Sequence, residues 1–142
     1  MKFKIGLVAS AFDLFHAGHV LYCKEAKELC DVVIAALHID PSVERPWKNA
    51  PIQTLEERMI QLQGCKYIDM IVTYNTKQEL AEIIKKYKVD VWVRGSDHKG
   101  KKCKYDDIVP NYHFHDREIH NYSSSALRKR IYERENKKRM KI

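Results

Sequence analysis

The chain has 142 residues, of which 44% are hydrophobic and 32% are charged. This composition is typical of one globular domain with a sizeable core. No apolar run approaches the roughly 20 residues of a membrane span, and residues 1–4 show no signal-peptide pattern, so we expect a cytoplasmic protein. The four cysteines form no C-x-x-C pair, which argues against a zinc ribbon and favours buried free thiols.

The formal charge of +7 is unevenly distributed. Residues 128–142 contain eight basic and two acidic residues, which leaves about +1 for the other 127 residues. We therefore predict a domain over residues 1–132 and a basic C-terminal tail over 133–142. Such a tail could bind nucleic acid or an anionic membrane, but a solvated helix end is the commoner cause. Nucleic acid is therefore not an expected partner.

The first third of the chain has the pattern of a βαβ unit. Residues 2–9 are predicted to form a buried strand, and a helix follows from about residue 18 to 30, with Cys23 and Cys30 on its apolar face. The continuous apolar run 32–37 is typical of a parallel strand that is covered on both faces. Residues 40–53 then hold three of the four prolines. Loops of this length often act as lids, and this one carries Arg45 and Lys48.

The rest of the chain continues the alternation. Capping boxes at residues 54–57 and 76–79 predict two helices. Strands are predicted at 67–74, 89–93 and 111–115, and a last helix begins at residues 123–125 with Leu127 and Ile131 facing inward. This order predicts an α/β fold, a Rossmann-like open parallel sheet of about five strands with helices on both faces. Ligands bind beyond the carboxyl ends of such strands, so the polar loops there are expected to gather at one edge.

The segment Phe12-Asp13-Leu14-Phe15-His16-Ala17-Gly18-His19 lies at the first strand-to-helix turn. A helix N-terminus has free N–H groups and the positive end of a dipole, so it attracts anions and phosphate in particular. Imidazoles can add hydrogen-bond donors there. A metal pair and purely structural histidines are the alternatives. No third metal ligand is evident, so we favour a phosphate site.

Several segments of the chain, in the same order, resemble the signature segments of one superfamily. The first segment resembles the H-x-G-H signature of the nucleotidylyltransferases, and most of all that of the small glycerol-3-phosphate cytidylyltransferases and their choline- and ethanolamine-phosphate relatives. The further matching segments are Glu57-Arg58-Met59, Lys66-Tyr67-Ile68-Asp69, Val93 to Lys101, and Tyr122-Ser123-Ser124-Ser125, with Arg117 before them. The match covers nearly the whole chain.

This resemblance implies the transfer of CMP from CTP to a small phosphomonoester, with glycerol 3-phosphate favoured, and the release of pyrophosphate. It also implies a homodimer and Mg²⁺ that is held mainly by the triphosphate, without a metal site of the protein's own. The residues that it assigns are His16, His19 and Lys48 to catalysis; Ala11, Phe12, Gly18, Asp97, Arg117, Ser123 and Ser124 to the nucleotide; and Asp13 and Lys66 to the substrate.

Some positions depart from the family pattern. The family's G-T-F-D is Ser10-Ala11-Phe12-Asp13 in this chain, and the tryptophan of its G-D-D-W loop is His98. A related adenylyltransferase or another alcohol- or sugar-phosphate cytidylyltransferase therefore stays an alternative. A non-catalytic nucleotide- or nucleic-acid-binding protein is a further hypothesis, although the intact His16 and His19 argue against it.

Overall fold

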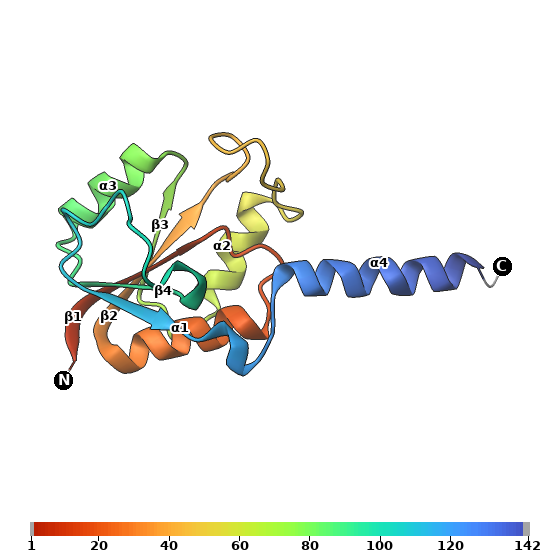
Figure 1. Cartoon of the computed structure of the whole chain (residues 1–142), viewed down its shortest axis with the longest axis horizontal. Coiled ribbons are helices and arrows are strands. Elements are labelled where there is room, and N and C mark those ends of the chain that lie inside the picture. The colour runs from red at the N-terminus through yellow and green to blue at the C-terminus, as the bar shows by residue number, and fades with distance from the viewer. Residues whose placement is uncertain (1, 141–142) are drawn as a thin grey trace.

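The computed structural model describes residues 2–140 as one five-stranded sheet with helices packed against it (Figure 1). The strands are β1 (Phe3–Ser10), β2 (Cys30–His38), β3 (Met70–Tyr74), β4 (Val91–Gly95) and β5 (Tyr112–His115). The helices are α1 (Ala17–Leu29), α2 (Leu55–Gln63), α3 (Lys77–Lys86) and α4 (Ser124–Met140), with short 3-10 helices at Ser96–His98 and Arg117–Ile119. All strand pairs are parallel, in the order β3-β2-β1-β4-β5. The predicted fold is confirmed.

Both faces of the sheet are covered, as the apolar sequence of β2 predicts. Val33, Ala35 and Leu37 of β2 pack with α1 and α2 on one face. Ile34 and Ala36 pack with α3 and with residues 103–109 on the other face. The two clusters explain why residues 33–37 of β2 are all apolar, because neither face of the strand meets water over this stretch.

The strand order places a cleft between β1 and β4. The central strand is β1. The chain first adds β2 and β3 on one side of β1, and then β4 and β5 on the other side. The connections that leave the carboxyl ends of β1 and β4 therefore run to opposite sides, and this switch point is where open α/β sheets bind ligands. The segment that holds both histidines follows β1, and the segment 96–98 follows β4.

The structure corrects three predictions about the elements. Cys30 begins β2 instead of ending the first helix, although Cys23 and Cys30 are both buried as expected. The third strand begins only at Met70, because residues 65–69 form turns that carry the chain from α2 back to the sheet. Ile131 is 50% exposed and not inward, because α4 projects away from the sheet and has no apolar surface to cover there (Figure 1).

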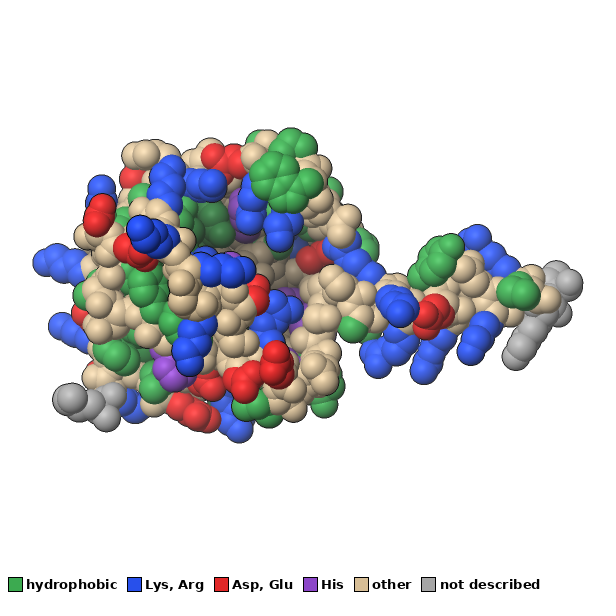
Figure 2. Space-filling model, in the orientation of Figure 1, with side chains coloured by type: hydrophobic (Ala, Val, Ile, Leu, Met, Phe, Trp, Pro, Cys, Tyr) green, Lys and Arg blue, Asp and Glu red, His purple; other side chains and the backbone are tan. Residues whose placement is uncertain are grey.

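The basic segment belongs to α4. This helix continues without a break past residue 132, where the domain boundary was predicted, and residues 141–142 of the predicted tail lie outside the described residues. Many basic side chains are visible along its projecting part (Figure 2). Among residues 2–140, no helix has both the length and the apolar character that crossing a membrane requires.

Candidate active site

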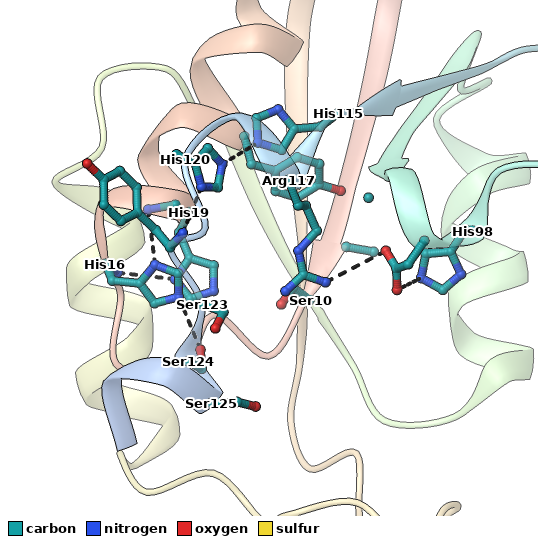
Figure 3. A pocket seen from close by; sticks show the side chains of 16 residues that line it. Ser10, His16, His19, His98, His115, Arg117, His120, Ser123, Ser124 and Ser125 are labelled. Carbon is teal, nitrogen blue, oxygen red and sulfur yellow. Dashed lines mark hydrogen bonds and ion pairs between the residues drawn. The ribbon is translucent and has the colours of Figure 1, made fainter. Parts of the chain in front are cut away.

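Two hollows lie side by side at the carboxyl end of the sheet. The first has a volume of about 290 Å³ and the second about 490 Å³. They form one cleft, because they share a wall made of Ala9, Ser10, Tyr22, Gly95, Asp97, His98 and Arg117. The first hollow also contains His16, Gly18, His19, His115, His120, Tyr122, Ser123, Ser124 and Ser125 (Figure 3). The polar loops thus gather at one edge, as predicted.

His16 and His19 cap α1 with their own rings. His16 is the N-cap residue, and its Nδ1 accepts a hydrogen bond from the N–H of Gly18 at 3.0 Å. The Nδ1 of His19 accepts from the N–H of His16 at 3.2 Å, and the two rings stack with centroids 3.9 Å apart. Since each Nδ1 is an acceptor, the proton of each neutral ring lies on Nε2. The two histidines therefore offer two Nε2–H donors.

Burial keeps both rings neutral. It lowers the pKa of His16, and nearby Arg117 and His120 lower it further. Burial also lowers the pKa of His19 to about 3, with further contributions from the neighbouring His16 and Arg117. At neutral pH the two rings in the free protein therefore act as hydrogen-bond donors without a positive charge. The charge for binding an anion comes from elsewhere in the cleft.

The N-terminus of α4 contacts residues 12–19, the segment that carries both histidines and is called the histidine turn below. Ser124 Oγ donates to the carbonyl of Asp13 at 3.3 Å and lies 3.2 Å from His16 Nε2, which is placed to donate to it. Ser123 Oγ accepts from the N–H of Ala126 at 3.1 Å, so Ser123 caps α4 as predicted. Two helix N-termini, those of α1 and α4, therefore face the same hollow. Each contributes free N–H groups and a favourable dipole for an anion.

Gly18 is required by close packing. A Cβ atom at this position would lie 2.7 Å from the carbonyl oxygen of Tyr122 and 2.9 Å from Cε1 of His16. The segment before α4 therefore passes directly over the first turn of α1. This contact brings the serines to the histidines, and a side chain at position 18 would separate them.

The residues before His16 contribute to the site mainly through their backbone. Phe12 is fully buried, and its ring packs against His19 at 5.5 Å between centroids. Its φ is 50° and that of Leu14 is 57°, which is an uncommon conformation for residues with a side chain. Ala11 lines the second hollow, and its carbonyl accepts from Arg58. An interaction of Phe12 with a nucleotide would therefore involve backbone atoms.

Asp13 is already saturated by the protein's own donors. Its carboxylate accepts from the N–H groups of Ile52 and Gln53 at 2.9 and 3.0 Å and from Arg128 at 2.7 Å. Burial alone would raise the pKa of Asp13, but these three donors outweigh it and hold the pKa below its usual value. Asp13 thus ties the histidine turn to the loop 40–53 and to α4. Because three donors already occupy the carboxylate of Asp13, few acceptor positions remain for the predicted contact with a substrate.

Arg117 reaches into the centre of the cleft (Figure 3). Its Nη1 lies 3.7 Å from Asp97 Oδ1, and Asp97 Oδ2 lies 3.7 Å from His98 Nε2. These groups are all partly exposed, so the pairs are loose and a ligand can compete for them. His98 Nδ1 in turn lies 3.1 Å from Nη2 of Arg94. The departure from the family's tryptophan therefore places a histidine against an arginine of β4.

A second pair of histidines anchors the segment before α4. His120 Nδ1 accepts from the N–H of Tyr122 at 2.9 Å, and its Nε2 lies 3.0 Å from Nε2 of His115. On the far side, His115 Nδ1 lies 3.3 Å from Glu25 of α1. This chain of contacts joins α1, β5 and the segment that carries Arg117 and the serines. Neither histidine was predicted as a site residue from the sequence, because they match none of the family's motifs.

The remaining predicted residues fall into two groups. Lys48 and Arg45, on the loop 40–53, line the second hollow as expected of a lid. Lys66 lines neither hollow. It lies in the turn before β3, three residues before Asp69, whose N–H donates to the carbonyl of Val33. This is the amino end of the sheet, opposite to the cleft, so Lys66 is not brought together with the other residues.

Arg58 is a positioning residue for which the sequence analysis proposed no role. It is only 2% exposed, and its guanidinium donates to the carbonyls of Ala11, His38 and Ile39 at 3.0, 2.7 and 2.7 Å. These carbonyls follow or end β1 and β2, so Arg58 holds both strand ends at the floor of the cleft. Its place in the matching segment Glu57-Arg58-Met59 was the available signal.

The described part of the chain contains no group of three or more His, Cys, Asp and Glu side chains that could hold a metal ion. The fold and this cleft define the class: a Rossmann-like α/β protein in which two histidines and two helix N-termini line one hollow at the carboxyl end of the sheet. Residues 7–137 match the family model described as cytidylyltransferase-like. The chain belongs to this family.

Curated relatives agree with this assignment. The bifunctional protein HldE of Campylobacter concisus is 35% identical over 136 residues, which are 95% of this chain and 28% of that protein. The ethanolamine-phosphate cytidylyltransferase of Mus musculus is 41% identical over 91 residues, which are 62% of this chain and 22% of the relative. This chain thus spans about a quarter of the length of these relatives.

Among solved structures, the lipopolysaccharide core biosynthesis protein of Thermoplasma volcanium shares the fold. It has a TM-score of 0.67 and 20% sequence identity, and the match covers 80% of this chain and 97% of that one.

Proposed function

We propose that this chain transfers a nucleotidyl group from a nucleoside triphosphate to a small phosphomonoester and releases pyrophosphate. CTP is the favoured nucleotide, and glycerol 3-phosphate is the first acceptor to test. The observation that carries the proposal is the meeting of α1 and α4 at His16 and Ser124, whose Nε2 and Oγ atoms lie 3.2 Å apart. Two helix N-termini and two neutral Nε2–H donors then face one hollow, as a polyphosphate requires.

The reaction needs little acid–base chemistry. An oxygen of the acceptor phosphate forms a bond to the α-phosphorus, and the bond from that phosphorus to the bridging oxygen breaks as pyrophosphate leaves with the electron pair. A phosphomonoester is largely a dianion at neutral pH, so no base has to remove a proton. Catalysis then consists of positioning the reactants and stabilising charge on the phosphoryl oxygens.

The residues of the cleft have distinct roles in this proposal. The Nε2–H groups of His16 and His19 donate to phosphate oxygens of the nucleotide, Ser123 and Ser124 with the amides of α4 hold the β- and γ-phosphates, and Arg117 supplies positive charge beside them. Lys48 adds charge from the loop 40–53 as this loop closes. Asp97 lies near the base or sugar. The nucleotide is used as its Mg²⁺ complex, because phosphate oxygens are ligands that Mg²⁺ prefers.

The test combines substrates systematically. The protein is incubated with Mg²⁺, each of the four nucleoside triphosphates in turn and a panel of phosphomonoesters, and pyrophosphate release is measured. We expect release with CTP. Release with ATP alone would favour the related adenylyltransferase instead. If no pair reacts, the enzymatic proposal fails, and a protein that only binds nucleotides or nucleic acid becomes the better hypothesis.

A substitution at His16 tests whether the contact between the N-termini of α1 and α4 serves the reaction. We expect His16→Ala to lower turnover by roughly two to three orders of magnitude, the effect of losing one transition-state donor. The matched control is His113→Ala, because His113 lines neither hollow and is a partly exposed histidine of β5. Similar turnover in the two variants would remove His16 from the mechanism.

A further inference from the structure

The second hollow is unusually rich in positive charge. The side chains of Arg45, Lys48, Lys77, Arg94 and Arg117 line it, against the two carboxylates of Glu44 and Asp97. Both carboxylates already have partners: Glu44 accepts from the N–H of Lys77 at 2.9 Å, and Asp97 lies 3.7 Å from Arg117. Arg45, Lys48, Lys77 and Arg94 take part in none of the ion pairs found among residues 2–140. The hollow therefore offers four cations without a counterion.

Arg94 is the most rigidly placed of these cations. It lies near the end of β4, and its guanidinium carbon is 4.5 Å from the centre of the Trp92 ring. Nη2 lies 3.1 Å from His98 Nδ1. Stacking on an aromatic ring and one hydrogen bond hold the planar group in place, while its other N–H groups stay available. A guanidinium held in this way is suited to bind phosphate or carboxylate in a bidentate manner.

The aromatic rings of this hollow are not arranged to receive a cation. One face of Trp92 is covered by Arg94, and the ring of Tyr105 packs against Trp92 in a T-shaped arrangement with centroids 5.3 Å apart. The ring of Tyr74 stacks on His38 at 4.5 Å. An ammonium group is bound by open aromatic faces or by unpaired carboxylates. In this hollow the rings of Trp92, Tyr74 and Tyr105 are buried against other side chains, and both carboxylates have partners. The four cations would in addition repel such a group.

We propose that the second hollow binds the acceptor, and that Arg94 selects acceptors whose alcohol part is neutral or anionic. This chemical class consists of phosphorylated polyols and sugars, and it excludes the zwitterionic phosphates of amino alcohols. The proposal rests on the proposed function, because it assigns the nucleotide to the first hollow. The proposal predicts that this chain differs from its ethanolamine-phosphate cytidylyltransferase relative in the charge on the alcohol part of the acceptor that it takes.

The first arm of the test compares acceptors. Pyrophosphate release is measured with the active nucleotide and with glycerol 3-phosphate, an aldose 1-phosphate, phosphocholine and phosphoethanolamine. We expect at least one of the first two to exceed both amino-alcohol phosphates tenfold or more in kcat/KM. Equal or greater kcat/KM for an amino-alcohol phosphate would overturn this inference and leave the proposed function intact. No release with any acceptor would count against the proposed function itself.

The second arm tests Arg94 directly. Arg94→Met keeps the length and apolar character of the side chain but removes its charge. We expect it to raise the KM for the acceptor roughly ten- to hundredfold and to change the KM for the nucleotide less than twofold. Arg94→Lys restores the charge without the planar fork, so an intermediate KM is expected. An equal rise in both KM values, or none in the acceptor's, would overturn the role of Arg94.

Controls keep this second arm interpretable. Arg134→Met removes the same charge from an exposed position on the projecting part of α4 and should leave both KM values unchanged. Thermal unfolding of each variant shows whether the fold survives the loss of the contact with Trp92. If Arg94→Met fails to fold, Arg94→Lys and the comparison of acceptors still decide the question.

Discussion

His16 and His19, at the N-terminus of α1, each accept a hydrogen bond from a backbone N–H at Nδ1 and line the first hollow, where Nε2 of His16 lies beside Ser124. The capping role of Nδ1 and the donor role of Nε2 therefore depend on each other. A proton added to Nδ1 would break the cap, and burial opposes that proton in any case. The same residues thus start the helix and prepare the donors.

The low pKa of His19 predicts how stability changes with pH. Its pKa is about 3 in the folded protein and about 6.5 in an unfolded chain, so the unfolded state takes up the proton first as the pH falls. The stabilising effect is therefore complete above pH 6.5 and is lost progressively below it. From pH 7.5 to pH 5, His19 should account for a loss of up to about 2 kcal/mol in the free energy of unfolding.

Urea unfolding at the two pH values measures this loss. His19→Asn keeps a side-chain acceptor for the N–H of His16 but does not titrate in this range. The variant should therefore lose less stability between pH 7.5 and pH 5 than the unmodified protein does. The same loss in both proteins would show that burial of His19 does not cause the dependence on pH.

Among the elements, α4 is attached to the domain only by its first turns. Ser124 contacts the histidine turn, and Arg128 donates to the buried carboxylate of Asp13 at 2.7 Å. The side chains beyond these residues are almost all exposed. The orientation of α4 therefore depends on a few polar contacts at its N-terminus, and those contacts also position the proposed phosphate site.

Substitution of Arg128 should affect both stability and nucleotide binding. Arg128→Ala removes a charged hydrogen bond from a carboxylate that is 6% exposed, which should cost about 1–3 kcal/mol in the free energy of unfolding. Because Ser123 and Ser124 lose this anchor, the KM for the nucleotide should rise several-fold. Urea unfolding and steady-state kinetics measure the two effects. Arg130→Ala, exposed on the same helix, is the control, and indistinguishable variants would contradict the anchoring role.

At the scale of the whole molecule, the cleft and the projecting half of α4 are separate features (Figures 1 and 2). All residues of the two hollows precede residue 126. A smaller hollow lined by Asp13 and His19 contains one residue beyond that position, Arg128. The basic residues from Lys129 onward lie outside the site. Their charge determines the pI of about 9.2 without a part in the proposed reaction.

Two truncations test this separation. Removal of residues 133–142 should leave turnover within about twofold of the full chain, because the lost part of α4 touches nothing in the site. Removal from residue 123 onward should abolish turnover, because Ser123, Ser124 and Arg128 are lost. Pyrophosphate release measures both. A large loss in the shorter truncation would show that the basic end contacts a ligand or a second copy, and sedimentation of both forms would then test the predicted homodimer.

The sequence by itself determined the order and type of the elements and the place of the strand-to-helix turn that carries His16 and His19. These depend on short-range physics: apolar periodicity, capping residues and the restricted conformations of proline and glycine. A prediction from the same local patterns was wrong where the position of a side chain depends on distant parts of the chain. Ile131 follows the pattern of an inward residue, but nothing in its neighbourhood reveals that the helix leaves the sheet after Arg128.

Only the tertiary structure decided which residues of the cleft are free to act. The family resemblance assigned Asp13 to the substrate, whereas Arg94 lay in a matching segment and had no predicted role. Asp13 is saturated by donors that lie about 40 and 115 residues away, whereas Arg94 has no carboxylate partner among the described residues. Lys66 lies at the opposite end of the sheet. Charge pairing between distant segments is set by how the chain folds back on itself, so the sequence pattern around each residue does not contain it.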